Sequence, residues 1–222
     1  MYPLSLDIRD RLCLVIGGGR VAERKVRGLL AAGGRVRVIS PDLVQGLQTL
    51  VEKGVIEWCA QPYTSARMVP AALVFAATNA PAVQRQVADD ARRVGALVNV
   101  ADAPQECDFQ VPATIRRGDL TIAVTTNGRS PAVAAMVRRR LELEIGPEYG
   151  LLVALAGRLR EQMLQEGTET EEPVGILFQK ILEGDIVQWL RDGQWHLVRR
   201  RLETVLGRSV DDVLETLIGE EP

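Results

Sequence analysis

The stretch from residue 12 to residue 26 constrains the fold more than any other part of the sequence. It begins with five apolar residues, Leu12–Ile16, a short run with β-branched members that is typical of a strand buried on both faces. Three glycines follow at positions 17–19, and apolar residues then recur at helical spacing from Val21 to Leu29. This change of period across a glycine turn predicts the first strand, turn and helix of a βαβ unit.

The glycine turn has the spacing of a dinucleotide-binding fingerprint. Gly17, Gly19 and Ala22 match the pattern G-x-G-x-x-A. The first glycine permits the tight turn, the second lets a pyrophosphate approach the main chain, and Ala22 takes the small position where helix and strand pack closely. The helix that begins here directs free N–H groups and a partial positive charge at the phosphates. A purely structural turn is the alternative, but the place of the glycines between strand and helix favours a dinucleotide.

Strand and helix patterns alternate through the first half of the chain. Apolar runs of strand length occur at residues 12–16, 35–40, 55–59, 73–78 and 96–100, and helical spacing occurs at residues 21–32, 41–53 and 81–94. This alternation predicts a Rossmann-type parallel sheet with its ligand crevice at the carboxyl ends of the strands. The lead before the first strand alternates at Tyr2, Leu4 and Leu6, as an edge strand or an arm does.

The pattern changes near Phe109. Residues 113–117 and 120–126 favour a β-hairpin, and a long helix is predicted from Pro131. A further amphipathic helix is predicted over residues 151–163, a polar loop over 165–173 and a helical tail from Val174 onward. The expected α/β organisation has three parts: a nucleotide-binding Rossmann domain at 1–112, a small α+β segment at 113–147 and a helical C-terminal domain at 148–222.

Size and composition argue against several classes of protein. The 222 residues carry a net charge of −2, which argues against a nucleic-acid partner held by the overall field of the protein. No apolar run reaches the roughly 18 residues of a membrane span and no signal-peptide pattern opens the chain. We therefore expect a cytoplasmic protein with no membrane partner. The 3 cysteines are scattered and His196 is the single histidine, so we expect no disulfide framework and no metal site.

The ribose of a bound dinucleotide needs a partner after the second strand. The acid that usually binds it, about twenty residues past the glycines, would fall near Ile39 or Ser40, and the first acid here is Asp42. Asp42 is a candidate ribose ligand, Ser40 and main-chain groups are an alternative, and Asp42 could instead cap the next helix. No basic residue in the turn selects a 2′-phosphate, although Arg35 and Arg37 lie in the strand, so NAD is preferred over NADP.

Two further strand ends carry candidate site residues. Asp102 ends the fifth predicted strand, where a nicotinamide ring and a substrate would meet. A carboxylate there can act as a general base if burial tunes its pKa toward the working pH. An aspartate that merely forms the turn before Pro104 is the structural alternative. Thr78 and Asn79 follow the fourth strand and are candidate cofactor contacts.

The start of the long helix has the features of an anion site. Ser130 is a favourable N-cap, Pro131 suits the first helical position, and such a helix start attracts anions. Arg129 lies beside it, with Arg116 and Arg117 on the predicted hairpin, so the region would suit a substrate with several carboxylates. The candidate substrate contacts are Asn127, Gly128, Arg129, Ser130 and Arg116.

Four segments taken together resemble the precorrin-2 dehydrogenase family, which includes the N-terminal module of multifunctional siroheme synthase. They are residues 15–26, 76–79, 99–104 and 127–131, and their order and spacing are similar to the family over roughly residues 1–162. The resemblance implies NAD-dependent oxidation of precorrin-2, a tetrapyrrole, to sirohydrochlorin in siroheme or cobalamin synthesis. It also implies a homodimer formed through residues 113–147.

Residue by residue, the resemblance implies cofactor contacts at Arg20 and Val21 and at Pro41 and Asp42. It implies that Asp102 is the catalytic aspartate. Some family members also insert a metal into the product, so iron or cobalt insertion by the same carboxylate is a further expectation.

Other functions remain as alternatives. A nucleotide-sensing module would bind NAD without turning over a tetrapyrrole, and a methyltransferase would use the glycine loop for S-adenosylmethionine. A hydroxyl position that is Ser in several relatives is Thr126 here, so a role that requires Ser is not carried over.

Overall fold

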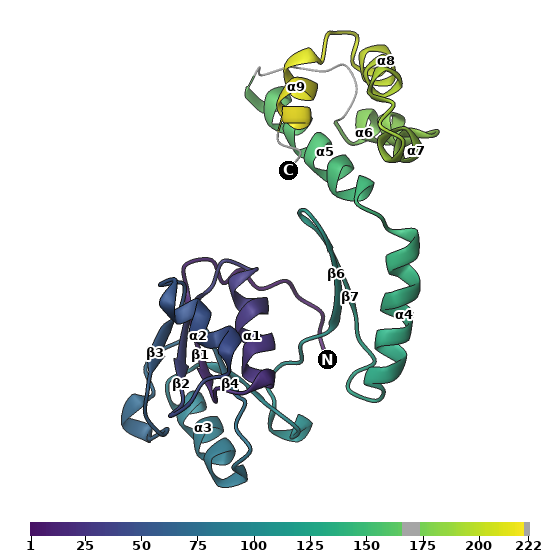
Figure 1. The fold of residues 1–222 in the computed structure, drawn as a ribbon. Helices are drawn as coiled ribbons and strands as arrows, with labels where there is room; N and C mark the ends of the chain where they lie inside the picture. The colour runs from purple at the N-terminus through teal and green to yellow at the C-terminus, as the bar shows by residue number, and fades with distance from the viewer. Residues whose placement is uncertain (166–173, 220–222) are drawn as a thin grey trace. The chain divides into compact units, whose positions relative to one another are not determined.

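The computed structural model describes residues 1–165 and 174–219, and the chain divides into two compact units, Met1–Val111 and Pro112–Pro222 (Figure 1). Each unit has a hydrophobic core of its own. The polar loop predicted over residues 165–173 lies outside the described residues from residue 166 onward.

The first unit is built on a five-stranded sheet with the strand order β3-β2-β1-β4-β5. Its strands are β1 (Leu12–Ile16), β2 (Arg35–Ile39), β3 (Glu57–Cys59), β4 (Leu73–Ala76) and β5 (Leu97–Val100). Every pairing is parallel, which confirms the predicted Rossmann-type sheet. The order reverses between β1 and β4, so the ligand crevice of such a sheet lies at the carboxyl ends of these two strands.

Helices cover both faces of this sheet. On one face α1 (Arg20–Leu30) and α2 (Gln45–Glu52) share a core with Cys13 and Val15 of β1. On the other face α3 (Pro81–Arg93) packs over Leu14 and Ile16. Because alternate residues of a strand point to opposite faces, the uninterrupted apolar run of β1 supplies both cores.

Two segments of the first unit have an irregular main chain where the sequence allows a helix or a strand. α2 begins at Gln45 rather than at residue 41, because residues 41–44 form an extended turn in which the Val44 N–H donates to Gly18 O at 2.9 Å. Residues 1–8 form no strand, so the arm is the alternative that the structure adopts. Tyr2 is 88% and Leu4 69% exposed on this arm.

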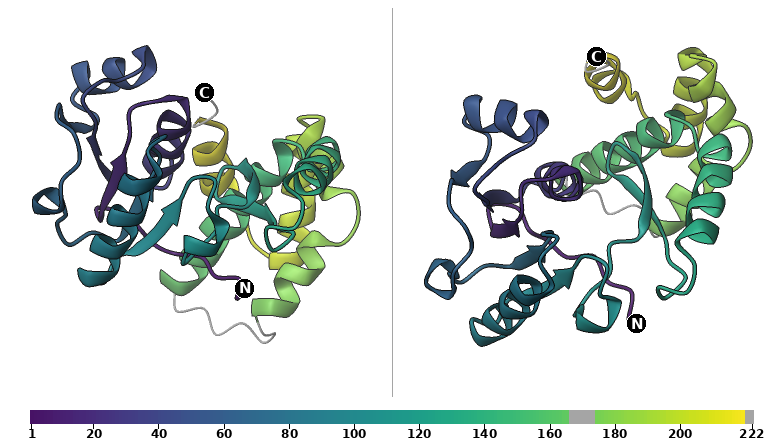
Figure 2. Two further views of the ribbon diagram at one scale, coloured as in Figure 1. Left: turned by 90° about the horizontal axis from the view of Figure 1, so that it is seen from below. Right: turned by 60° about the horizontal axis from the view of Figure 1, so that its bottom comes forward.

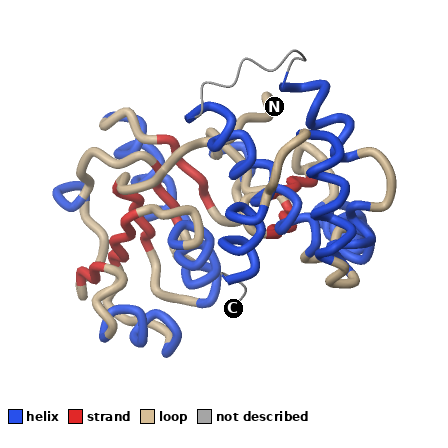
Figure 3. Tube along the Cα trace, turned by 90° about the horizontal axis from the view of Figure 1, so that it is seen from above, coloured by secondary structure: helices blue, strands red, loops and turns tan. Residues whose placement is uncertain are grey.

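The second unit begins with an antiparallel hairpin, β6 (Ala113–Arg117) and β7 (Leu120–Val124), in which Ile115 pairs with Ile122. The long helix α4 (Pro131–Glu144) packs along the hairpin (Figure 1). The remaining helices are α5 (Glu148–Gln165), α6 (Val174–Leu182), α7 (Ile186–Arg191), α8 (Trp195–Leu206) and α9 (Asp211–Gly219). These helices pack together (Figures 2 and 3), and their core includes the fully buried Leu159 and Leu202. The predicted hairpin and helical C-terminal region are confirmed.

Arg117 of the hairpin forms hydrogen bonds with the end of α4, next to the turn that leads into α5. Its Nε donates to Ile145 O at 2.9 Å and its Nη2 donates to Glu142 O at 3.5 Å, so the guanidinium caps the carboxyl end of α4. A Cβ on Gly150 of α5 would lie 2.9 Å from the Arg117 carbonyl carbon, so helix and hairpin turn are in close contact. The expectation that Arg117 joins an anion site is therefore wrong, because its donors are used within the fold.

Candidate functional site

The turn between β1 and α1 depends on two glycines that touch neighbouring loops. Gly17 has φ +121°, and a Cβ there would lie 2.2 Å from Ala77 O, just beyond β4. A Cβ on Gly18 would lie 1.9 Å from Asp42 O, just beyond β2. The loops after β1, β2 and β4 therefore meet at the carboxyl edge of the sheet, as the sequence analysis predicts.

Gly19 differs from both of these glycines. It is the N-cap residue of α1, no side chain caps this helix end, and a Cβ at this position would meet nothing within 4 Å. The space over the start of α1 is therefore open, and main-chain N–H groups of the first turn face it. This is the arrangement that a dinucleotide pyrophosphate requires. Ala22 is fully buried against the sheet, as its small size in the fingerprint predicts.

The turn after β2 is held by a tryptophan that sequence reasoning missed. The indole Nε1 of Trp58 donates to Ser40 O at 2.9 Å, and the Ser40 N–H donates to Cys59 O at 3.2 Å. Pro41 and Asp42 stand exposed on this turn. Val44, not Asp42, is the N-cap residue of α2, so the capping role considered for Asp42 is wrong.

The two arginines of β2 are engaged in ion pairs with a neighbouring strand. Arg37 lies 2.5 Å and Arg35 3.4 Å from Glu57 of β3. The hydrogen bond from Arg37, helped by the charges of both arginines and the hydrogen bond from Arg35, lowers the pKa of Glu57, although burial opposes this shift. Both guanidinium groups of β2 are therefore engaged within the sheet, by one shared carboxylate.

The exposed strand ends on the β4 side carry the other predicted cofactor contacts. Thr78 O accepts a hydrogen bond from the Gln84 side chain at 2.6 Å, and Thr78 Oγ1 accepts one from the Ala80 N–H at 3.4 Å. Asn79 is exposed, as are Arg20 and Val21 at the start of α1.

Asp102 lies just beyond β5 on the same edge of the sheet. The N–H of Ala101 donates to Ala76 O at 2.9 Å, which joins this loop to the end of β4 beside Ala77. Asp102 is exposed in the single chain, so the burial considered for it in the sequence analysis is not found. It has φ +60°, a left-handed conformation that is uncommon for a residue other than glycine. Within the described part of the chain its carboxylate has no ion pair or hydrogen bond. The side chain is therefore free to meet a ligand.

The predicted substrate contacts lie in the second unit, at the start of α4. Asn127 has φ +53° and forms the turn with Gly128, and Ser130 caps the helix by accepting a hydrogen bond from the Val133 N–H at 3.2 Å. The Thr126 hydroxyl accepts a hydrogen bond from the Ser130 N–H and donates one to Ser130 O, both at 3.0 Å. Arg129 and Arg116 are exposed. The role of this loop in substrate binding stays a prediction.

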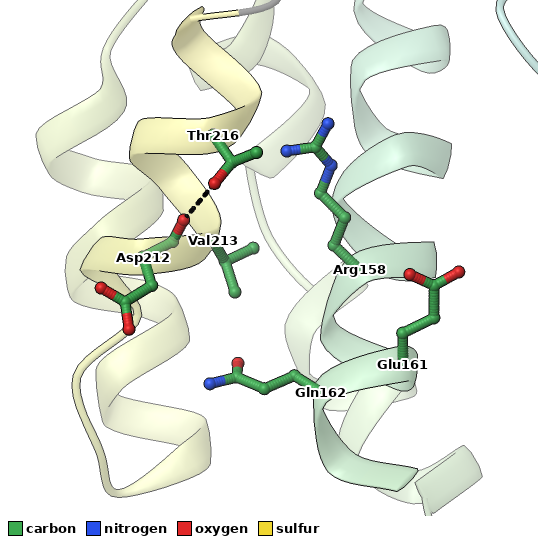
Figure 4. A pocket seen from close by; sticks show the side chains of 6 residues that line it. All are labelled: Arg158, Glu161, Gln162, Asp212, Val213 and Thr216. Atoms are coloured by element: carbon green, nitrogen blue, oxygen red, sulfur yellow. Dashed lines mark hydrogen bonds between the residues drawn. The ribbon is translucent and has the colours of Figure 1, made fainter. Parts of the chain in front are cut away.

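A separate hollow lies between α5 and α9, with a cavity volume of about 400 Å³ (Figure 4). Its lining carries charges of both signs and consists of Arg158, Glu161, Gln162, Asp212, Val213 and Thr216. None of the predicted site residues lines it.

In residues 1–165 and 174–219, no cluster of three or more potential metal ligands is found, and no helix is both long and apolar enough to cross a membrane.

Comparison with known proteins finds matching sequence profiles and similar proteins. The sequence profile described as "Putative NAD(P)-binding" matches residues 4–113, and the profile described as "Sirohaem biosynthesis protein central" matches residues 117–143. The chain is 38% identical over 222 residues to a siroheme synthase of Nitrosococcus oceani, covering 99% of this chain and 47% of the relative. It is 37% identical over 204 residues to a siroheme synthase of Methylobacillus flagellatus, covering 92% of this chain and 44% of the relative.

The chain is similar to these siroheme synthases along nearly all of its own length. It spans less than half of the length of these siroheme synthases. Among solved structures, "SirC, precorrin-2 dehydrogenase" shares the fold, with a TM-score of 0.75, 22% identity, and coverage of 94% of this chain and 100% of that one. The glycine turn lies within the region matched by the NAD(P)-binding profile, and the start of α4 lies within the region matched by the central profile.

Proposed function

We propose that the chain is an NAD-dependent dehydrogenase that oxidises precorrin-2 to sirohydrochlorin. The observation that carries the proposal is the pairing, on one sheet edge, of an open helix start at Gly19 with the exposed carboxylate of Asp102. The names of its siroheme synthase relatives and of the SirC structure support the choice of substrate. The proposed substrate is therefore a tetrapyrrole precursor of siroheme.

NAD fits the residues around the glycine turn. The proposed contacts are Gly17, Gly19, Arg20, Val21, Ala22, Pro41, Asp42, Thr78 and Asn79. The exposed carboxylate of Asp42 suits ribose hydroxyls and would repel a 2′-phosphate, and Glu57 already engages the arginines of β2. NAD is therefore proposed in preference to NADP. When bound, NAD supplies the acceptor for a hydride.

Asp102 is proposed to remove the proton that leaves with the hydride. Oxidation of a carbon–carbon bond in the macrocycle releases one hydride and one proton, so a base near the reacting carbon assists the step. Its exposure on the sheet edge leaves the carboxylate accessible, and its left-handed main chain sets the direction in which the side chain leaves β5.

The substrate and the oligomer are proposed to involve the second unit. Asn127, Gly128, Arg129, Ser130 and Arg116 would bind the carboxylates of the macrocycle through the positive end of α4 and two guanidinium groups. Val133 and Met136 of α4 are 45% and 57% exposed in the single chain, which supports a homodimer formed through residues 113–147. We place the protein in the cytoplasm, because the proposed reaction belongs to tetrapyrrole synthesis.

An anaerobic assay with purified protein, precorrin-2 and NAD tests the proposal. We expect NADH and sirohydrochlorin to form together, with NADP a poorer acceptor. Binding of NAD without formation of either product would overturn the dehydrogenase and favour the nucleotide-sensing alternative. Addition of ferrous or cobaltous ion after oxidation tests metal insertion by the same protein, read from the absorbance of the metallated macrocycle.

A further inference from the structure

The loop that carries Asp102 is short and held in an unusual conformation. Asp102 has φ +60°, and the loop joins β5 to a short 3-10 turn, Pro104–Glu106. A left-handed conformation costs an aspartate conformational energy, which surrounding contacts offset. The contacts that do so come from residues 99, 107 and 108, which we call the β5 clasp.

Cys107 is the centre of the β5 clasp. Its Sγ accepts a hydrogen bond from the Val100 N–H at 3.1 Å, and it lies 3.3 Å from Val100 O and 3.4 Å from Ala103 O, either of which can accept the thiol proton. Val100 precedes the Asp102 turn and Ala103 follows it. The thiol therefore joins both sides of the turn.

Asp108 and Asn99 extend this connection along β5. The Asp108 carboxylate accepts a hydrogen bond from the Val98 N–H at 2.9 Å, while the Asp108 N–H donates to Val98 O at 2.9 Å. The Asn99 side chain donates to Phe109 O at 3.0 Å and reaches Cys107 Sγ at 3.6 Å. β5 is an edge strand, so one side of it has no neighbouring strand. These side chains form hydrogen bonds with main-chain groups of β5 that a further strand would otherwise bind.

The β5 clasp is anchored on aromatic rings of the first unit. The ring of Phe109 packs edge-on against Phe75 of β4 at a centroid distance of 5.4 Å. On Phe75 the ammonium of Lys25, from α1, lies 5.2 Å from the ring centroid. The segment after Cys107 is thus tied to the strand and the helix that shape the glycine turn.

We propose that the β5 clasp positions Asp102 for the reaction and that Cys107 is its main positioning residue. The thiol keeps the loop closed by hydrogen bonds on both sides of the left-handed residue, so the carboxylate keeps one direction relative to the sheet edge. This inference rests on the proposed function for its kinetic consequence. Its structural consequence, a closed loop over residues 101–106, is independent of any activity.

The test compares Cys107→Ala with Cys107→Ser. Alanine removes both the donor and the acceptor, whereas serine keeps both in a shorter side chain. We expect Cys107→Ala to lower kcat by about tenfold to a hundredfold, as a misplaced catalytic group does, with the Kd for NAD changed less than twofold. Cys107→Ser should recover most of the loss, and Cys59→Ala, at the other end of the sheet, should behave as the wild type. An unchanged kcat in Cys107→Ala, or an equal loss in both Cys107 variants, would overturn the inference.

Amide hydrogen exchange gives a second measurement that needs no turnover. In Cys107→Ala the hydrogen-bonded amides of Val100, Ala101 and Glu106 should exchange at least tenfold faster than in the wild type, while those of β1 keep their protection. If exchange accelerates but the wild type makes no NADH, the proposed function fails and the clasp stands. If exchange does not change, the clasp fails whatever the activity. Asp108→Ala serves as the second variant if Cys107→Ala does not fold, with the same expected exchange.

Discussion

The main-chain oxygen of Asp42 lies 1.9 Å from the point where a Cβ on Gly18 would stand. The turn after β2 therefore rests directly on the glycine turn after β1, and the Val44 N–H donates to Gly18 O at 2.9 Å to hold them together. A proposed ribose contact and a proposed phosphate contact are thus parts of one rigid surface. The middle glycine, which the fingerprint leaves free, is required here by packing.

Gly18→Ala should destabilise the first unit. The added methyl group has no space against the main chain of residue 42, and overpacking of this kind costs about 1–3 kcal/mol. Chemical denaturation of the variant and the wild type gives the difference in unfolding free energy. Gly28→Ala is the matched control, because Gly28 lies in α1 and a Cβ there meets nothing within 4 Å. That control should be neutral or more stable by up to about 1 kcal/mol. Equal stability of Gly18→Ala and wild type would contradict the close packing.

Gly19→Val should weaken NAD binding and leave the fold intact. Its side chain meets no protein atom within 4 Å at the Cβ position, so the fold should survive with only a small loss in stability. The branched side chain would stand in the space assigned to the pyrophosphate, and NAD affinity should fall at least tenfold. Isothermal titration with NAD measures the affinity, and the melting temperature monitors the fold. Undiminished NAD binding would remove the glycine turn from the proposed site.

Asp102→Asn should separate chemistry from binding. The amide has nearly the shape of the carboxylate but cannot take a proton, and loss of a general base lowers kcat by about 10²–10⁴-fold. NAD affinity should stay near that of the wild type, because Asp102 is not among the proposed cofactor contacts. The measurement is NADH formation from precorrin-2 alongside a separate NAD titration. A variant as active as the wild type would exclude Asp102 as the base.

Acid should weaken the second unit through Glu148, which is 4% exposed and lies 2.7 Å from the Arg191 guanidinium. Burial by itself raises the pKa of Glu148, but the hydrogen bond and charge of Arg191, with main-chain N–H groups, outweigh it and leave the pKa below its usual value. A carboxylate whose pKa is lower in the folded state stabilises the protein above its unfolded pKa and loses that contribution as the pH falls through the folded pKa.

The comparison of wild type with Glu148→Gln isolates this contribution. The difference in unfolding free energy between the two should be constant at neutral pH and should shrink as the pH falls below the usual Glu value of about 4.5. Arg191→Met should show the same trend, because it removes the partner. A difference that grows on acidification would mean that the pKa of Glu148 is raised rather than lowered.

Periodicity and spacing determined most of the first unit. The switch from a five-residue apolar run to helical spacing at Val21 is a local property, and the parallel sheet, its strand ends and the fingerprint glycines follow from such patterns. The sequence therefore predicts that residues 17–19, 40–42 and 78–79 lie at one sheet edge, and the structure brings them there. Asp102 reaches the same edge because it follows the next parallel strand.

Only the tertiary structure decided which polar groups remain available at that edge. The Trp58 indole donates a hydrogen bond to the carbonyl of Ser40, which is 18 residues away in the sequence. The Arg117 guanidinium caps α4 by a hydrogen bond to Ile145, which is 28 residues away in the sequence. Cys107 bonds to Val100 across 7 residues of irregular loop. Hydrogen bonds of this kind depend on how turns and helix ends pack against one another. The periodicity of apolar residues along the sequence does not predict that packing. The chain's own pattern thus placed Asp102 at the edge, while contacts between distant residues decided that the Arg117 guanidinium is used within the fold.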